Sequence, residues 1–187
     1  MMAAAGWYIY YGRDGEVIPP NVTRVRIDKS LTVIPALAFR GNRNIEEVDC
    51  HGVETVGEYA FYNCPSLKLV IMRGVKVIEQ FAFDDCVALT IVECGELEII
   101  GYKAFDRCES LRSINLTSAK IVERWAFNCC KALTNVKFGK ELESIERSAF
   151  IGCTSLERIT IPLKDGIITA DYIFHECEKL EHVDLVE

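Results

Sequence analysis

The segment that decides the fold is residues 78–94, which read IEQFAFDDCVALTIVEC. Within it an Ala-Phe pair is followed by a Cys three residues after the Phe, a Leu six after it and a Val nine after it. These residues are Ala82, Phe83, Cys86, Leu89 and Val92. The same spacing recurs at 22 to 24 residues around seven Phe anchors: Phe39, Phe61, Phe83, Phe105, Phe127, Phe150 and Phe174. The chain is therefore expected to consist of seven stacked repeats.

Each repeat also predicts one short strand. In residues 67–72 the side chains of Val70 and Met72 lie on one side, and those of Leu69 and Ile71 on the other, because strand side chains alternate. The recurring apolar column is expected to point into a core that neighbouring coils bury. A second apolar pair before each Ala-Phe step, such as Val75 with Ile78, is expected to line the opposite wall.

The combined pattern, L-x-x-V-x-hydrophobic followed by I-x-x-x-A-F-x-x-C-x-x-L, resembles the BspA-like, or Treponema pallidum-type, leucine-rich repeat over residues 22–187. The resemblance implies a β-rich solenoid of the α/β type, a right-handed superhelix with a parallel concave sheet. The lead-in at residues 15–35 is similar to that of uncharacterised diatom members. Members of the family are mostly binding proteins, many of them adhesins, and no catalytic residues come with the resemblance.

The chain is expected to form one continuous domain, with a cap at residues 1–21 and the solenoid at 22–187. The aromatic stretch 7–18 contains the turn signal Asp14-Gly15, which predicts a small hairpin over the first coil. The alternative is an exposed aromatic docking segment. The last repeat ends the chain without a cap of its own, so its coil is a candidate contact for a homo-oligomer.

Nine cysteines invite a disulfide or metal interpretation, and their period argues against both. Six form a ladder that starts with Asn42 as its first rung: Cys64, Cys86, Cys108, Cys130, Cys153 and Cys177. Parallel side chains on successive rungs disfavour disulfides, and a thiol is a small buried group with a weak donor. Cys50 and Cys94 are expected in the core, whereas Cys129 is expected to be exposed and oxidisable. Unpaired thiols favour an intracellular location, cytoplasmic or nuclear, over a secreted one.

Enzyme chemistry, cofactors and metals find no support in the sequence. The three His residues lie far apart in register, and no phosphate-binding loop, CxxC pair or nucleophile elbow is present. The net charge of −7 disfavours nucleic acid as a partner. No apolar run approaches the roughly 18 residues of a membrane span.

The candidate site consists of solvent-facing residues at positions where the repeat pattern requires no particular residue type. Leu69, Ile71 and Ile91 are expected to form an apolar centre on the concave face, and its charged surroundings comprise Asp49, Glu93, Glu47, Arg24 and Arg26. The plainer explanation is that β-branched residues suit strands. The sequence thus predicts a non-catalytic module that binds a protein or peptide. The alternatives are an assembly subunit that docks through its termini, and a cell-surface adhesin.

Overall fold

The computed structural model describes residues 2–3, 6–168 and 171–187, with side chains described from residue 6 onward. Its strands are β1 (Met2–Ala3), β2 (Trp7–Tyr10), β3 (Arg24–Ile27), β4 (Val33–Ile34), β5 (Glu47–Asp49), β6 (Thr55–Val56), β7 (Leu69–Ile71), β8 (Val77–Ile78), β9 (Ile91–Glu93), β10 (Ile99–Ile100), β11 (Ile121–Val122), β12 (Asn135–Lys137), β13 (Ser144–Ile145), β14 (Arg158–Pro162) and β15 (His182–Val186). No helix is present in the described residues.

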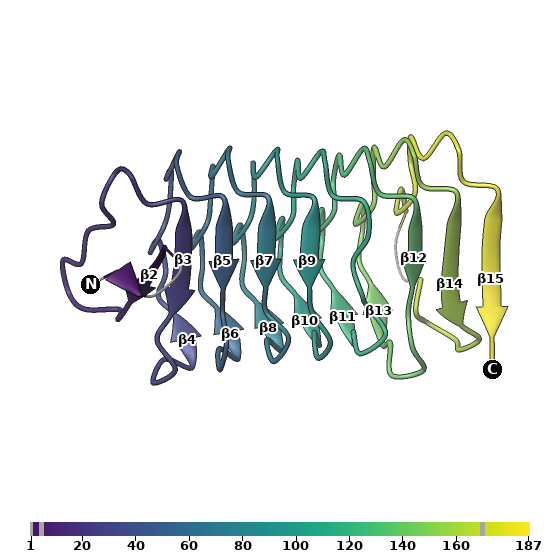
Figure 1. Ribbon diagram of the computed structural model, residues 1–187. Coiled ribbons are helices and arrows are strands. Elements are labelled where there is room, and N and C mark those ends of the chain that lie inside the picture. Colours follow the sequence, from purple (N-terminus) through teal and green to yellow (C-terminus); the bar gives the residue numbers. More distant parts are fainter. Residues whose placement is uncertain (1, 4–5, 169–170) are drawn as a thin grey trace.

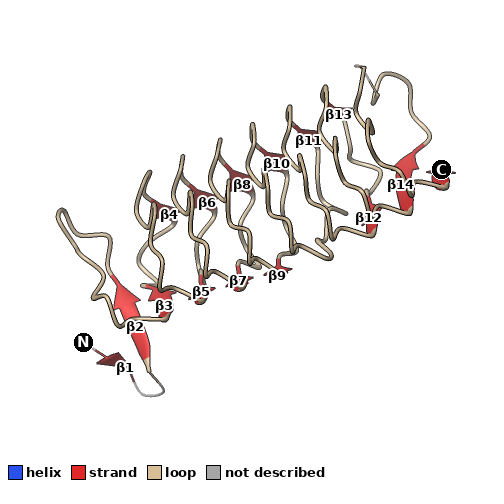
Figure 2. Ribbon diagram, turned by 90° about the horizontal axis from the view of Figure 1, so that it is seen from above, coloured by secondary structure: helices blue, strands red, loops and turns tan. Residues whose placement is uncertain are grey.

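The strands form a solenoid with two walls (Figure 1). One wall holds the longer strands, in the order β1-β2-β3-β5-β7-β9 and, as a separate sheet, β12-β14-β15. The other holds two-residue strands in the order β4-β6-β8-β10-β11-β13. All pairs are parallel except β1 with β2. We call the outer surface of the first wall the long-strand face; viewed from above, both walls run with little curvature (Figure 2).

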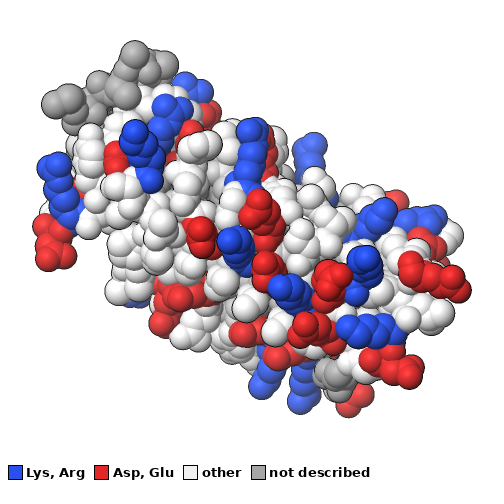
Figure 3. All heavy atoms as spheres, turned by 90° about the horizontal axis from the view of Figure 1, so that it is seen from below, with Lys and Arg blue, Asp and Glu red and all other residues white. Residues whose placement is uncertain are grey.

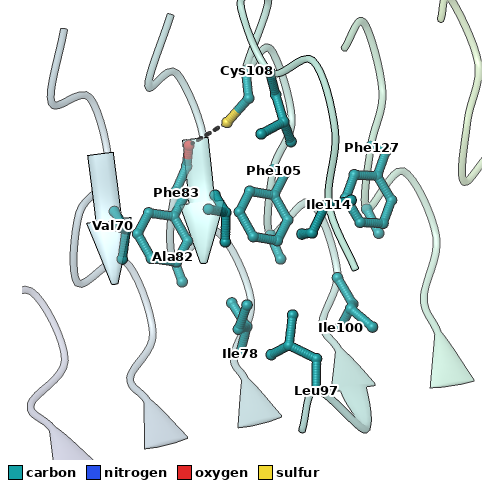
Figure 4. Close-up of a cluster of buried hydrophobic side chains, with 14 of the residues drawn as sticks. Val70, Ile78, Ala82, Phe83, Leu97, Ile100, Phe105, Cys108, Ile114 and Phe127 are labelled. Carbon is teal, nitrogen blue, oxygen red and sulfur yellow. Dashed lines mark hydrogen bonds between the residues drawn. The ribbon is translucent and has the colours of Figure 1, made fainter. Parts of the chain in front are cut away.

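The core lies between the walls and is built from the repeating columns that the sequence predicts. The seven anchor Phe rings stack from coil to coil; Phe83 and Phe105, for example, lie with ring centroids 5.2 Å apart and planes 4° from parallel. Figure 4 shows this stack flanked by Val70 and Ile114 from one wall and Ile78 and Ile100 from the other. Tyr10 of β2 closes the stack at its first ring, 4.7 Å from Phe39.

Two left-handed residues in every coil turn the chain around the anchor Phe. Around Phe83 they are Phe81, with φ 57°, and Asp85, with φ 64°. The N–H groups of Phe81, Phe83 and Asp85 all donate to carbonyls of the next coil, at 2.8 to 2.9 Å. A left-handed conformation costs about 1–2 kcal/mol per non-glycine residue, and these bonds between coils offset that cost.

This geometry corrects the expectation of an α/β type of solenoid. The segment around each anchor Phe, which joins the two walls, has two residues with left-handed backbone angles within five residues. It therefore cannot form a helix. The molecule is a β-solenoid of about seven coils. The right-handed sense of its winding stays a prediction.

The long-strand sheet is interrupted at the fifth coil, between β9 and β12 (Figure 1). In earlier coils a backbone N–H bridges to the next coil, as Met72 does to Glu93 at 2.8 Å. At the equivalent step the Cys94 thiol contacts the Asn115 carbonyl instead, at 3.3 Å. The Asn115 side chain folds back and accepts bonds from the Thr117 N–H and hydroxyl, at 3.1 and 2.7 Å. The Asn115 side chain thus forms hydrogen bonds within its own turn, at a point where the other coils continue the sheet.

The N-terminal segment extends the long-strand wall by two strands, β1 and β2. β2 pairs in parallel with β3 and antiparallel with β1. The chain does turn at Asp14-Gly15, where the Glu16 N–H donates to the Arg13 carbonyl at 2.9 Å, but residues 16–18 form no strand. Among the described residues no strand pair forms across this turn; β2 instead pairs in antiparallel with β1 and in parallel with β3 of the first coil. The division into a cap and a solenoid stays a prediction.

Candidate functional site

The structure brings the predicted apolar centre together on the long-strand face. Leu69 of β7 lies directly opposite Ile91 of β9, and Ile71 lies opposite Glu93. Ile91 is 52% exposed, whereas Leu69 and Ile71 are half-buried. The alternation of strand side chains causes this arrangement, since Val70 and Val92 between them face the core. The three residues form one exposed apolar cluster.

The charged residues on the N-terminal side of this cluster are paired with one another. Arg24 Nε lies 3.0 Å from Glu47 Oε2, and Arg26 Nε lies 2.9 Å from Asp49 Oδ2. Both pairs join residues in register on β3 and β5. Such exposed pairs stabilise a fold by about 1 kcal/mol or less. They nevertheless order the surface beside Leu69 and Ile71.

Glu93, on the C-terminal side, is also paired: its Oε2 lies 2.6 Å from Arg73 Nη2. All five charged residues of the predicted site therefore have an ionic partner within the chain. The apolar cluster of Leu69, Ile71 and Ile91, in contrast, takes part in no ion pair.

Trp7, which the sequence pattern predicts to lie in the cap, belongs to the same surface. The parallel register of β2 with β3 sets Trp7 beside Arg24 and Ile9 beside Arg26. The guanidinium carbons of Arg24 and Arg26 lie 5.5 and 5.0 Å from the Trp7 ring centre, within the range of cation–π attraction. The signal that could have found this was the alternation of Trp7 and Ile9 with Tyr8 and Tyr10.

Two open cavities follow the turns at the ends of β3, β5 and β7. The first, about 410 Å³, is lined in part by Ile9, Arg26 and Asp49, and the second, about 330 Å³, in part by Asp49 and Ile71. His51 lines both. Together they make a shallow groove that borders the apolar cluster at Ile71, a shape that suits a peptide better than an enclosed small molecule.

The cysteine ladder is a structural device. Each of its six thiols donates to the carbonyl of the anchor Phe in the preceding coil, at 3.0 to 3.2 Å. Asn42, on the first rung, instead accepts bonds from the N–H groups of Asn44 and Ile45 at 2.9 and 3.0 Å. All nine cysteines are free. No group of three or more metal-ligating side chains occurs in the part of the chain that the structure describes.

Cys129 differs from its predicted role. It is half-buried rather than exposed, and this burial raises the pKa of its thiol. Because the thiolate is the form that oxidises, a raised pKa disfavours oxidation at neutral pH. The residue occupies a left-handed position, with φ 55°, one residue before the ladder rung Cys130.

Two buried carboxylates lie in adjacent coils, each one residue after its anchor Phe. Asp106 is 3% exposed and is held by Lys103 Nζ at 3.0 Å and by Asn128 Nδ2 at 2.8 Å. Asp84 is 8% exposed. Its burial and the negative charge of Asp106 raise the pKa of Asp84 to about 7. Asp84 is therefore a source of pH-dependent stability.

The last coil exposes residues whose equivalents are buried elsewhere. Val183 is 50% exposed and Leu185 58% exposed, whereas Ile159 and Ile161 one coil earlier are buried. Contact between copies through this coil stays a prediction. No helix in the described ranges is both long and apolar enough to cross a membrane.

Fold and site together define a repeat protein of the leucine-rich type, with stacked coils, a cysteine ladder of recurring spacing and an exposed sheet face. The family model described as "BspA type Leucine rich repeat region (6 copies)" matches residues 19–121 and 76–187. The chain belongs to this BspA-type leucine-rich repeat family. A search of curated proteins found no match.

Solved structures of three bacterial proteins share the fold. A leucine-rich cell surface protein from Faecalibacterium prausnitzii is 23% identical with a TM-score of 0.60, the alignment covering 89% of this chain and 54% of that one. A leucine-rich repeat protein from Bacteroides ovatus is 20% identical with a TM-score of 0.63, and the alignment covers 91% of this chain and 53% of that one. The T. pallidum leucine-rich repeat protein is 20% identical with a TM-score of 0.57, and the alignment covers 86% of this chain and 68% of that one. The chain spans about half the length of the first two.

Proposed function

We propose that the protein is a non-catalytic interaction module that holds a protein or peptide on its long-strand face. The observation that carries the proposal is the cross-strand pair Leu69–Ile91, with Ile71 beside it, on the last two strands of the solvent-facing six-stranded sheet. Fully burying one such side chain contributes roughly 1.5–3 kcal/mol. Three of them support a contact of about micromolar affinity after the costs of association.

The surroundings of the cluster support the same proposal. Ordered ion pairs flank the cluster, as in the polar rim of an interface, and the groove at Asp49 and His51 provides an adjoining path for an extended chain. Trp7 adds an aromatic anchor of the kind that dominates binding energies. We place this module in a reducing, intracellular compartment, a proposal that the nine free thiols support.

The test is affinity capture from the cells in which the chain is naturally made, followed by mass spectrometry. Leu69→Asp combined with Ile91→Asp is expected to abolish capture of any specific partner, because two carboxylates replace the apolar centre. The matched control is Val87→Asp with Leu163→Asp, which changes two exposed apolar residues outside this face. Circular dichroism and melting curves establish that both variants fold. Retained capture by the first variant would exclude the long-strand face.

A further inference from the structure

The second wall also presents an apolar strip to solvent, on the opposite side of its strands from the core. Each two-residue strand buries its second residue, as Ile78 and Ile100 show, and turns its first residue outward. Five of these outward residues lie side by side in parallel register: Val33, Thr55, Val77, Ile99 and Ile121. Val33 is 47% exposed and the other four are half-buried. The repeat does not require apolar residues at these positions.

A cavity of about 440 Å³ opens on this strip, and we call it the short-strand groove. Val77, Ile99 and Gly101 provide its apolar lining, and Glu58, Glu79 and Glu123 its charged lining. Gly101 is required by the fold, since a Cβ there would lie 2.7 Å from the Ile78 carbonyl oxygen. Its missing side chain keeps the groove open.

Two of the glutamates are fixed in place by the backbone. Glu79 Oε2 accepts a hydrogen bond from the Glu58 N–H at 2.9 Å, and Glu123 Oε2 accepts one from the Tyr102 N–H at 2.8 Å. Each bond joins neighbouring coils. One oxygen of each carboxylate is thus used to hold the side chain, and the other is available for a further donor.

The charges on the two borders of the strip differ. On one border the acids are neutralised by lysines of the next coil: Lys76 Nζ lies 3.7 Å from Glu54 and Lys120 Nζ lies 2.7 Å from Glu98. Paired charges of this kind are interspersed over the lower surface of the molecule (Figure 3). On the other border, Glu58, Glu79 and Glu123 form no ion pair with any residue that the structure describes. The groove therefore carries uncompensated negative charge beside an apolar floor.

We propose that the short-strand groove binds an extended segment of a partner protein that carries Lys or Arg at every third residue. The aliphatic stems of such side chains pack on Val77 and Ile99 while their cationic heads reach the glutamates. Glu79 and Glu123 belong to coils two apart, which places them roughly 10 Å from each other at the usual strand spacing of about 4.8 Å. A polyproline II segment repeats its side-chain direction every three residues, or about 9 Å, and so matches this interval.

This proposal concerns a different surface from the long-strand face, so either can fail without the other. The probe is a fluorescein-labelled peptide of four Pro-Pro-Lys repeats, measured by fluorescence anisotropy at low and high salt. We expect saturable binding that weakens with salt, because the contact is largely ionic. A peptide of four Pro-Pro-Glu repeats is expected not to bind. A peptide of the same composition with its four lysines adjacent is expected to bind several-fold more weakly.

The decisive variant is Glu58→Gln with Glu79→Gln and Glu123→Gln, which keeps an oxygen for the two backbone N–H groups. It is expected to weaken binding at least tenfold. The matched control, Glu96→Gln with Glu109→Gln and Glu141→Gln, makes the same change in net charge outside the groove and is expected to bind as the wild type does. Equal losses in both variants, unchanged binding in the first, or no binding by the wild type would each overturn the proposal. Equal affinity for the clustered-lysine peptide would overturn the every-third-residue spacing.

Discussion

The Cys108 thiol donates a hydrogen bond to the backbone carbonyl of Phe83 in the preceding coil, with sulfur and oxygen 3.2 Å apart (Figure 4). Both groups are fully buried. The thiol is the second donor to this carbonyl, which also accepts a hydrogen bond from the Cys86 N–H at 3.1 Å. The carbonyl lies in the turn around the anchor Phe, with a left-handed residue on either side.

Replacing Cys108 with Ala should therefore destabilise the protein more than its small loss of volume suggests. The Phe83 carbonyl would lose one of its two donors and keep the Cys86 N–H at 3.1 Å, and the lost hydrogen bond contributes about 0.5–1.5 kcal/mol. Cys108→Ser keeps a donor and is expected to lose less. Urea unfolding followed by circular dichroism measures both variants. Equal losses would show that packing, not the hydrogen bond, accounts for the thiol.

The reactivity of the thiols should follow their position in the ladder. The Cys153 thiol can donate to the Cys177 sulfur once that sulfur is a thiolate, and this lowers the pKa of the half-buried Cys177. Burial raises that of Cys129, and raises that of Cys94 to about 11. A maleimide at pH 7 is expected to label Cys177 first in the native protein, because the thiolate reacts. Peptide mass spectrometry reads the order, and earlier labelling of Cys129 would contradict it.

Stability should fall as the pH rises through neutrality because of Asp84. Its folded pKa of about 7 lies above the ordinary value of 3.8, so the folded state binds this proton more tightly. The resulting stabilisation is complete below about pH 4 and is lost as the pH rises through about 7.

Asp84→Asn removes this proton and is expected to flatten that part of the pH profile. At pH 8 the variant should be more stable than the wild type by up to about 4 kcal/mol. Chemical unfolding at pH 5 and pH 8 provides the measurement, with the exposed Asp165→Asn as control. A wild-type stability that does not change between these pH values would refute the assignment.

Gly139 lies where the backbones of two neighbouring coils approach closely. A Cβ at this position would clash with the Thr117 carbonyl oxygen, whereas one at Gly74 would meet nothing closer than 3.8 Å. Gly139→Ala is expected to lower the free energy of unfolding by about 2 kcal/mol or more, because backbone must shift. Gly74→Ala should stay within about 0.5 kcal/mol. Thermal melting compares the two, and equal melting temperatures would disprove the close contact.

Much of this fold follows from spacing alone. The period places Phe83 on Phe105 and Cys108 beside the preceding coil, and strand alternation pairs Leu69 with Ile91. The pairing of Arg26 with Asp49 also follows from register, since the two stand 23 residues apart in neighbouring coils. These features depend on which residues recur, and recurrence is visible in a sequence.

Other features depend on local chemistry that recurrence does not show. Bulky residues such as Phe81 seldom adopt a left-handed φ. The residue type at this position therefore does not predict the turn. The break in the sheet reflects the side chain of Asn115, which bonds to Thr117. The outward strip at Val77 and Ile99 is hard to recognise in the sequence because the neighbouring core residues already account for the apolar run. The signal for it was a β-branched residue directly before each buried one.

The ladder bond between Cys108 and Phe83 has a consequence for how such a chain can change its length. Every thiol finds its acceptor in the coil before it, so the bond depends on adjacency and not on the identity of the coil. Deletion of residues 86–107 would join Asp85 to Cys108 and offer that thiol the carbonyl of Phe61. A whole coil is thus an exchangeable genetic unit, and duplication or loss of 22 codons preserves every buried partnership at the junction.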